Sequence, residues 1–145
     1  MGEGKGNYLR SSLFPKGKTI KIQSPETERY NCVAWVLGQT DIWYEPDEDY
    51  RWPEHLPLND ELDTMRAFFE YFGYRVCANE KYEIGYQKIA LFTQSNAFTH
   101  VARQESDGQW TSKLGVSYDV AHRLQELSGG MYGELAVLMK KRWDD

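Results

Sequence analysis

Cys32 is the residue of this chain whose surroundings best suit chemistry. It follows Asn31, a good helix-capping residue, and it opens an apolar run over residues 32–37 that ends at Gly38. At the start of a helix, unpaired backbone N–H groups favour the thiolate and lower the pKa of a thiol. The same run also suits a buried strand, because periodicity does not separate the two at this length. We predict a helix, with a small buried structural thiol as the alternative for Cys32.

His100 is the second candidate, because an imidazole can take a proton from a thiol near neutral pH. A structural histidine that bonds to the backbone is the alternative. A catalytic pair also needs a third group that orients the imidazole. The predicted turn at Asp107-Gly108 brings the next strand back beside His100 at residues 112–115, where Ser112 is available. Asp119, further along the chain, is the alternative third group and would supply a carboxylate.

The remaining cysteine and histidines predict no metal site and no cofactor. Cys77, His55 and His122 lack the paired spacing that zinc ligands usually have. We expect Cys77 to pack in a strand and His55 to face solvent. We expect His122 to form a surface pair with Glu126, one helical turn later.

The elements that must position these residues form an α+β order, with a helix first and a run of antiparallel strands after it. A flexible leader is predicted over residues 1–18, and a single domain over residues 19–145. Residues 39–58 form a long loop with Trp43 and Trp52. Helices are predicted over 32–37, 60–72 and 117–128, the last capped by Ser117, and strands over 19–22, 74–78, 88–93, 99–105, 109–113 and 134–139.

Composition bounds the function of the chain. With 145 residues and a formal net charge of −5, it has the size of one domain, and its acidity argues against nonspecific nucleic-acid binding. Ten acidic residues against two arginines lie within residues 26–61, whereas five basic residues against one acid lie within residues 1–22. We interpret the basic leader as a solvated terminus. Without a long apolar run or a signal peptide, we expect a cytoplasmic protein that neither spans nor binds a membrane and has two free thiols.

The arrangement of these motifs resembles the papain-like cysteine peptidase superfamily, above all its compact NlpC/P60-like branch. Asn31-Cys32 stands where that branch has an acidic residue and its nucleophile, and His100-Val101-Ala102 stands where it has its general base. Ser112 falls at the position of its third polar residue. The resemblance implies a papain-like fold in which an N-terminal helix that carries Cys32 packs on a small antiparallel sheet. Residues 30–142 also resemble an uncharacterised family of small bacterial proteins, mainly over residues 30–35, 99–104 and 110–115.

The resemblance implies a cysteine hydrolase or acyltransferase that acts on an amide or ester of an unknown small molecule, peptide or protein. Cys32 would attack the carbonyl, and its backbone N–H together with Gln23 would meet the oxyanion. Asn31, Trp43 and Trp52 would contribute to the substrate site, although Trp43 and Trp52 could equally be core residues. The alternative is a non-catalytic protein-binding module, of an immunity or adaptor type, on the same fold. It is favoured by Ser112, which offers no negative charge, and by the acidic aromatic loop.

Overall fold

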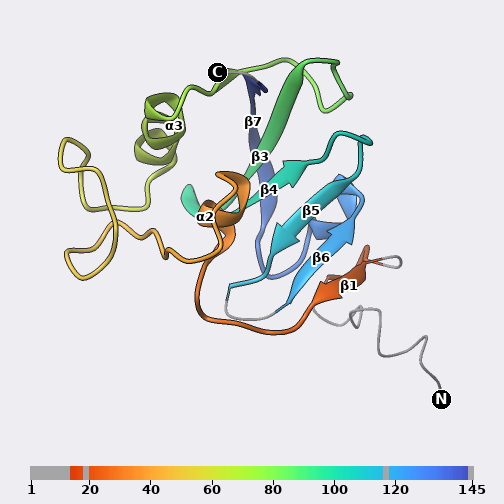
Figure 1. Cartoon of the computed structure of the whole chain (residues 1–145), viewed down its shortest axis with the longest axis horizontal. Helices are drawn as coiled ribbons and strands as arrows, with labels where there is room; N and C mark the ends of the chain where they lie inside the picture. The colour runs from red at the N-terminus through yellow and green to blue at the C-terminus, as the bar shows by residue number, and fades with distance from the viewer. Residues whose placement is uncertain (1–13, 18–19, 116–117, 144–145) are drawn as a thin grey trace.

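The computed structural model describes residues 14–17, 20–115 and 118–143. It is a mixed α+β protein built on a seven-stranded antiparallel sheet with the order β1-β6-β5-β4-β3-β7-β2 (Figure 1). Along the chain, its elements are β1 (Lys21–Ser24), α2 (Cys32–Val36), α3 (Leu62–Tyr71), β2 (Arg75–Val76), β3 (Tyr86–Gln94), β4 (Ala97–Gln104), β5 (Trp110–Lys113), β6 (Asp119–His122), the 3-10 helix η1 (Leu124–Leu127) and β7 (Glu134–Arg142).

The sheet separates two apolar cores, because successive side chains of a strand point to opposite faces. On one face, Leu91 of β3 and Val101 of β4 pack with α2 and α3. On the other face, Phe92 and Ala102 pack with η1 and with residues near the start of the described chain, such as Phe14. Figure 1 shows α2 beside β4 and β5, with α3 further out. We call these the helix face and the η1 face.

The helix that begins at Cys32 is confirmed, and so is its cap. The Asn31 side chain accepts a hydrogen bond from the Ala34 N–H at 3.2 Å, and Gly38 takes a positive φ of 77° just after the helix. A left-handed residue at this position is the usual end of a helix. The second helix, α3, begins two residues later than predicted, and the Asn59 side chain accepts a hydrogen bond from the Glu61 N–H before its first turn.

The hairpin between β4 and β5 is confirmed at Asp107-Gly108. Gly108 has a φ of 86°, and the Asp107 carboxylate accepts a hydrogen bond from the Gln109 N–H at 2.9 Å. The strands pair in a register that sets Arg103 opposite Thr111. This register places Ser112 on the same face as Ala102 and His100.

The helix predicted over residues 117–128 is wrong. Residues 119–122 form β6, which lies between β1 and β5, and a short 3-10 helix follows at Leu124–Leu127. The predicted cap, Ser117, lies outside the described residues. Val120, Leu124 and Leu127 fit a helical stripe, but Val120 and His122 also share a two-residue period and lie buried on one face of β6. Tertiary pairing on both edges of this segment overrides its helical pattern.

The remaining strands are found with shifted ends. Residue 19 lies outside the described residues, and β1 extends to Ser24 rather than ending at residue 22. The strand predicted over residues 74–78 shrinks to Arg75–Val76, which leaves the half-buried Cys77 beyond its end. By contrast, β3 and β7 are each nine residues long and pair along most of their length.

Part of the predicted leader belongs to the core. Residues 1–13 lie outside the described residues, but the Phe14 side chain is fully buried on the η1 face, and its ring lies 5.6 Å from the Tyr132 ring. Residues 14–17 therefore pack against the sheet.

Candidate functional site

A pocket of about 320 Å³ opens at the start of α2, and it brings together four of the predicted site residues. Asn31, Cys32, Trp43 and Trp52 all line it. The other lining residues are Val33, Tyr44, Glu45, Pro46, Asp60, Met65, Phe98, Thr99, Gly115 and Tyr132. Its volume falls at the lower end of the range of ligand pockets, about 300–1,000 Å³. The sequence therefore located one wall of this site.

The long loop between α2 and α3 forms this wall because several of its rings are held in place. The Asn31 amide donates a hydrogen bond to the Tyr44 carbonyl at 2.6 Å, which ties the loop to the start of α2. The Trp52 ring stacks on the Phe68 ring of α3 at 4.8 Å with an interplanar angle of 16°. The Trp43 indole N–H donates a hydrogen bond to the Glu45 carboxylate at 2.6 Å.

Cys32 lies in the pocket wall as a neutral thiol. Its side chain is buried, and burial raises the pKa of the thiol to about 11, although backbone N–H donors of Val101, Val33 and Cys32 itself pull the pKa downward. The helix dipole adds little because α2 has five residues. At neutral pH the thiolate is therefore a small minority.

His100 and Cys32 lie on opposite faces of the sheet. Cys32 packs on the helix face with Val101, whereas His100, one residue earlier in β4, points to the η1 face. The His100 ring stacks on the Tyr132 ring at 4.2 Å and lies 6.1 Å from the Phe92 ring. Neither ring nitrogen of His100 has a hydrogen-bond partner among the described residues, so no hydrogen bond joins it to Cys32. Burial lowers the pKa of His100 well below its usual value, and nearby His122 lowers it further.

Ser112 lies on the face of His100 but bonds to a different histidine. Its hydroxyl is 2.7 Å from Nε2 of His122, whose Nδ1 is 2.9 Å from the Arg123 carbonyl. Because a carbonyl can only accept, Nδ1 carries the proton and Nε2 accepts from Ser112. Burial lowers the pKa of His122 to about 4. The predicted surface pair of His122 is therefore wrong, since its side chain is buried in β6.

Asp119 bonds to Tyr30, a residue of the helix-face core. Its buried carboxylate accepts a hydrogen bond from the Tyr30 hydroxyl at 2.9 Å. Lys113, opposite Asp119 in the β5–β6 pairing, lies over the Tyr30 ring at 5.0 Å. These contacts make Asp119 part of the packing between the sheet and the segment that precedes α2.

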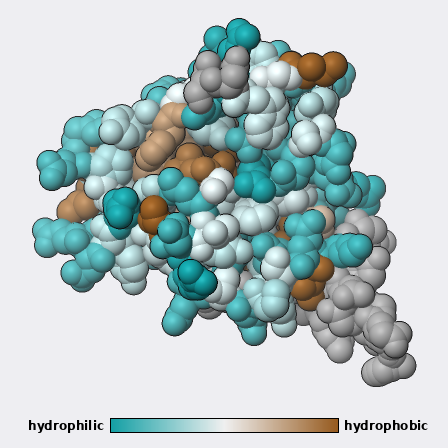
Figure 2. Space-filling model, viewed as in Figure 1, coloured by the Kyte–Doolittle hydropathy of each residue, from teal (hydrophilic) through white to brown (hydrophobic). Residues whose placement is uncertain are grey.

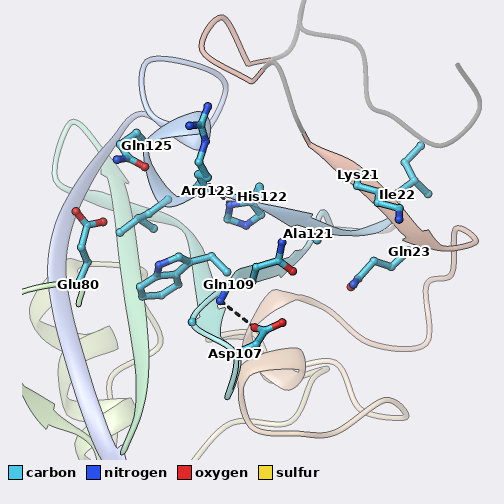
Figure 3. Close-up of a pocket in the computed structure, with 13 residues that line it drawn as sticks. Lys21, Ile22, Gln23, Glu80, Asp107, Gln109, Ala121, His122, Arg123 and Gln125 are labelled. Carbon is cyan, nitrogen blue, oxygen red and sulfur yellow. Dashed lines mark hydrogen bonds between the residues drawn. The ribbon is translucent and has the colours of Figure 1, made fainter. Parts of the chain in front are cut away.

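Gln23 lies in a different depression from Cys32. This open hollow of about 1230 Å³ is lined by polar residues of β1, β6 and the β4–β5 turn. Figure 3 shows Lys21 and Gln23 on one side of it and Glu80 and Gln125 on the other, with His122 between them. Gln23 is not among the described residues that line the pocket beside Cys32.

The pocket residues that were not predicted as site residues come from segments that lie far apart in the sequence. Glu45 and Asp60 were visible as part of the acidic run, and Phe98, Thr99 and Tyr132 come from β4 and from the turn before β7. A charge count marks the acidic run, but no local pattern indicates that Tyr132 folds back onto the start of α2.

Two further expectations concern metals and membranes. Within the described ranges, no group of three or more His, Cys, Asp or Glu residues is placed to hold a metal ion. Among the helices of the same ranges, none combines the length and apolar character needed to cross a membrane.

Comparison with known proteins places the chain in a family. A family model described as a domain of unknown function, DUF7689, matches residues 21–140. No curated protein and no solved structure matches the chain. Because the match spans well over half of the 145 residues, the chain belongs to the DUF7689 family of domains of unknown function.

Proposed function

We propose that this chain is a non-catalytic binding module that holds one side chain of a protein partner in the pocket beside Cys32. The observation that carries the proposal is an aromatic, acidic pocket whose thiol is neutral and whose described lining residues include no imidazole. Large aromatic residues around a pocket are typical of sites that anchor a partner protein.

A catalytic thiol needs a base within hydrogen-bond reach of the sulfur, directly or through one water. Neither ring nitrogen of His100 has a hydrogen-bond partner among the described residues, so His100 is not such a base. A shift of β4 by one residue would bring His100 to the face of Cys32, but it would turn every other side chain of the strand to the opposite face as well. Val101 and Ala102 are fully buried, one in each core, so this shift would disrupt the packing of both cores. The sheet therefore favours a binding role over turnover.

A cysteine hydrolase or acyltransferase with papain-like character is the second candidate, because one observation favours it. Cys32 is the first residue of α2 and lines the pocket, which is where an attacking sulfur would meet a bound carbonyl. In this hypothesis the roles of His100 and Ser112, which lie on the η1 face, would have to be taken by groups on the helix face, and Asp119 would have to act while it accepts a hydrogen bond from Tyr30. The catalytic assignment of those three residues stays a prediction.

Thiol reactivity separates the two candidates. We expect iodoacetamide at pH 6 to label Cys77, which is half-buried, faster than Cys32, and we expect His100→Ala to leave the Cys32 rate unchanged. The measurement is mass spectrometry of the two cysteine-containing peptides over time. Selective labelling of Cys32 at pH 6 that disappears in His100→Ala would overturn the non-catalytic proposal.

Partner capture tests the binding role directly. Immobilised wild-type chain, Cys32→Ser and Trp43→Ala are compared on lysate of cells that naturally produce the protein. We expect a partner that the wild-type chain and Cys32→Ser enrich equally and that Trp43→Ala loses. Trp143→Ala is the matched control, because Trp143 is about half exposed and does not line the pocket. A partner that binds all four chains equally would contradict the use of this pocket.

A further inference from the structure

We infer that the side chain held in this pocket is cationic, a lysine ammonium or an arginine guanidinium of the partner. This inference rests on the proposed binding function and specifies its ligand. It follows from the charge, the rings and the size of the pocket, which are independent features of the described residues.

The first step is the charge of the lining. Glu45 and Asp60 both line the pocket, and among its described lining residues there is no lysine, arginine or histidine. Asp60 is exposed, and its backbone carbonyl accepts a hydrogen bond from the Phe98 N–H at 2.8 Å, which fixes the position of its main chain at the rim. Two carboxylates in the lining attract a cation and repel an anion, and the Lys113 ammonium, which donates to the carbonyl of the lining residue Gly115, is an internal cation that opposes them in part.

The second step is the rings. Trp43, Tyr44 and Trp52 line the pocket, and the electron-rich face of an indole or phenol ring attracts a cation within about 6 Å of its centre. Elsewhere in the chain such faces are already used, as where the Arg103 guanidinium lies 4.2 Å from the centre of the Trp35 ring. Within the described residues, no internal cation lies over any ring of this pocket.

The third step is preorganisation. The Glu45 carboxylate accepts from the Trp43 indole, so one negative charge is held at the edge of that ring. The Tyr44 hydroxyl donates to the Gln39 side chain at 2.7 Å, and the Tyr44 ring meets the Phe68 ring edge to face at 5.5 Å. Rings and carboxylates that are fixed in this way lose little entropy when a ligand arrives.

The fourth step is size and surroundings. A volume of about 320 Å³ accommodates one long side chain, and the apolar Met65 and Val33 in the lining can pack against its methylene stem. The loop outside the pocket adds to the attraction, because residues 41–63 carry nine acids and one arginine. A field of this sign raises the local concentration of a basic partner.

The experiment uses the full chain and small probes. Nα-acetyl-lysine amide and Nα-acetyl-arginine amide are titrated while the indole N–H signals of Trp43 and Trp52 are followed by NMR. Nα-acetyl-norleucine amide, which has a comparable chain without the charge, is the control probe. We expect saturable shifts with at least one of the cationic probes, weaker binding at high salt, and no comparable binding of the norleucine probe.

Two variants sharpen the test. Asp60→Asn is expected to weaken the binding of the cationic probe about two- to fivefold, as expected for the loss of an exposed ion pair. Glu48→Gln is the matched control, because Glu48 is an exposed acid of the same loop that does not line the pocket. Equal binding of the norleucine probe, or equal binding of wild type and Asp60→Asn, would overturn the inference. A captured partner that needs Trp43 but not Asp60 would leave the binding function standing and remove only its cationic ligand.

Discussion

The two faces of the central strands place neighbouring residues in different surroundings. On the helix face, the loop over residues 37–61 leaves a pocket beside Cys32, with acids and rings at its rim. On the η1 face, one residue away along β4, His100 is fully buried between apolar neighbours. The difference shows that residue type alone does not assign a catalytic role to a cysteine or a histidine. The face of the sheet on which the residue lies must also be known. The following predictions test this contrast.

The largest expected effect comes from removing one phenylalanine on each face. Phe68 and Phe92 are both fully buried, on the helix face and the η1 face respectively. Substitution of either by alanine should lower the free energy of unfolding by about 3–5 kcal/mol, because each leaves a cavity. Urea denaturation measures this change.

The two phenylalanines should differ in binding, because the Phe68 ring supports Trp52 in the pocket wall and the Phe92 ring does not. If the alanine variants do not fold, Phe68→Leu and Phe92→Leu give the same comparison with a smaller loss of stability. We expect partner capture to fall in the Phe68 variant alone. An equal loss in both variants would contradict a site confined to the helix face.

Acid should destabilise the chain mainly through the η1 face. His100 and His122 are buried with folded-state pKa values below the usual 6.5, so the unfolded chain binds more protons as the pH falls through that value. Their stabilisation is therefore complete above pH 6.5 and is lost progressively on the way down to the folded-state pKa values. From pH 6.5 to pH 5, His122 alone should cost about 1.5 kcal/mol of unfolding free energy, and His100 adds a loss of the same sign.

Replacement of one buried histidine tests the source of this acid sensitivity. His100→Phe should make the pH dependence shallower and cost little stability at pH 7, because an apolar ring needs no hydrogen bonds and can stack on Tyr132. His55→Gln is the control, since His55 is exposed. An unchanged slope in His100→Phe would show that other groups cause the acid sensitivity.

Local sequence patterns predicted much of the fold, but they did not show on which face of the sheet each candidate residue lies. Asn31 and Gly38 marked the ends of α2, because capping acts over a few residues. Asp107-Gly108 marked the turn between β4 and β5, because a tight turn also depends only on local residues. The spacing along that hairpin also placed Ser112 on the face of His100. It could not show that Cys32 packs against the opposite face of β4, because that depends on where α2 docks.

The misassigned segment at residues 119–122 has a similar cause. Its residues suit a helix or a strand. One of its neighbours in the sheet, β1, lies far from it in the sequence, so only tertiary pairing decides. Only some of the residues that line the pocket were predicted as site residues. The clustering of Trp43 and Trp52 with acids was visible in one loop, whereas Phe98 and Tyr132 reach the same pocket through long-range contacts.

The smallest expected effect concerns Ser112, whose two hypothetical roles predict different outcomes. As the partner of His122, its hydroxyl satisfies a buried ring nitrogen, so Ser112→Ala should cost about 1–2 kcal/mol of unfolding free energy. As the orienting residue of a catalytic pair, its loss should instead change the reactivity of Cys32. We expect the stability loss in urea denaturation, with unchanged iodoacetamide labelling of Cys32.

Ser106→Ala is the control for this substitution, because Ser106 is exposed in the β4–β5 turn and its loss should leave both measurements unchanged. A Ser112→Ala chain of wild-type stability with altered Cys32 labelling would contradict the separation of the two faces. Ser112 is fully buried on the η1 face, so an effect on Cys32 would have to pass through the sheet or through Tyr132, which stacks on His100 and also lines the pocket. The serine therefore reports whether the two faces act independently.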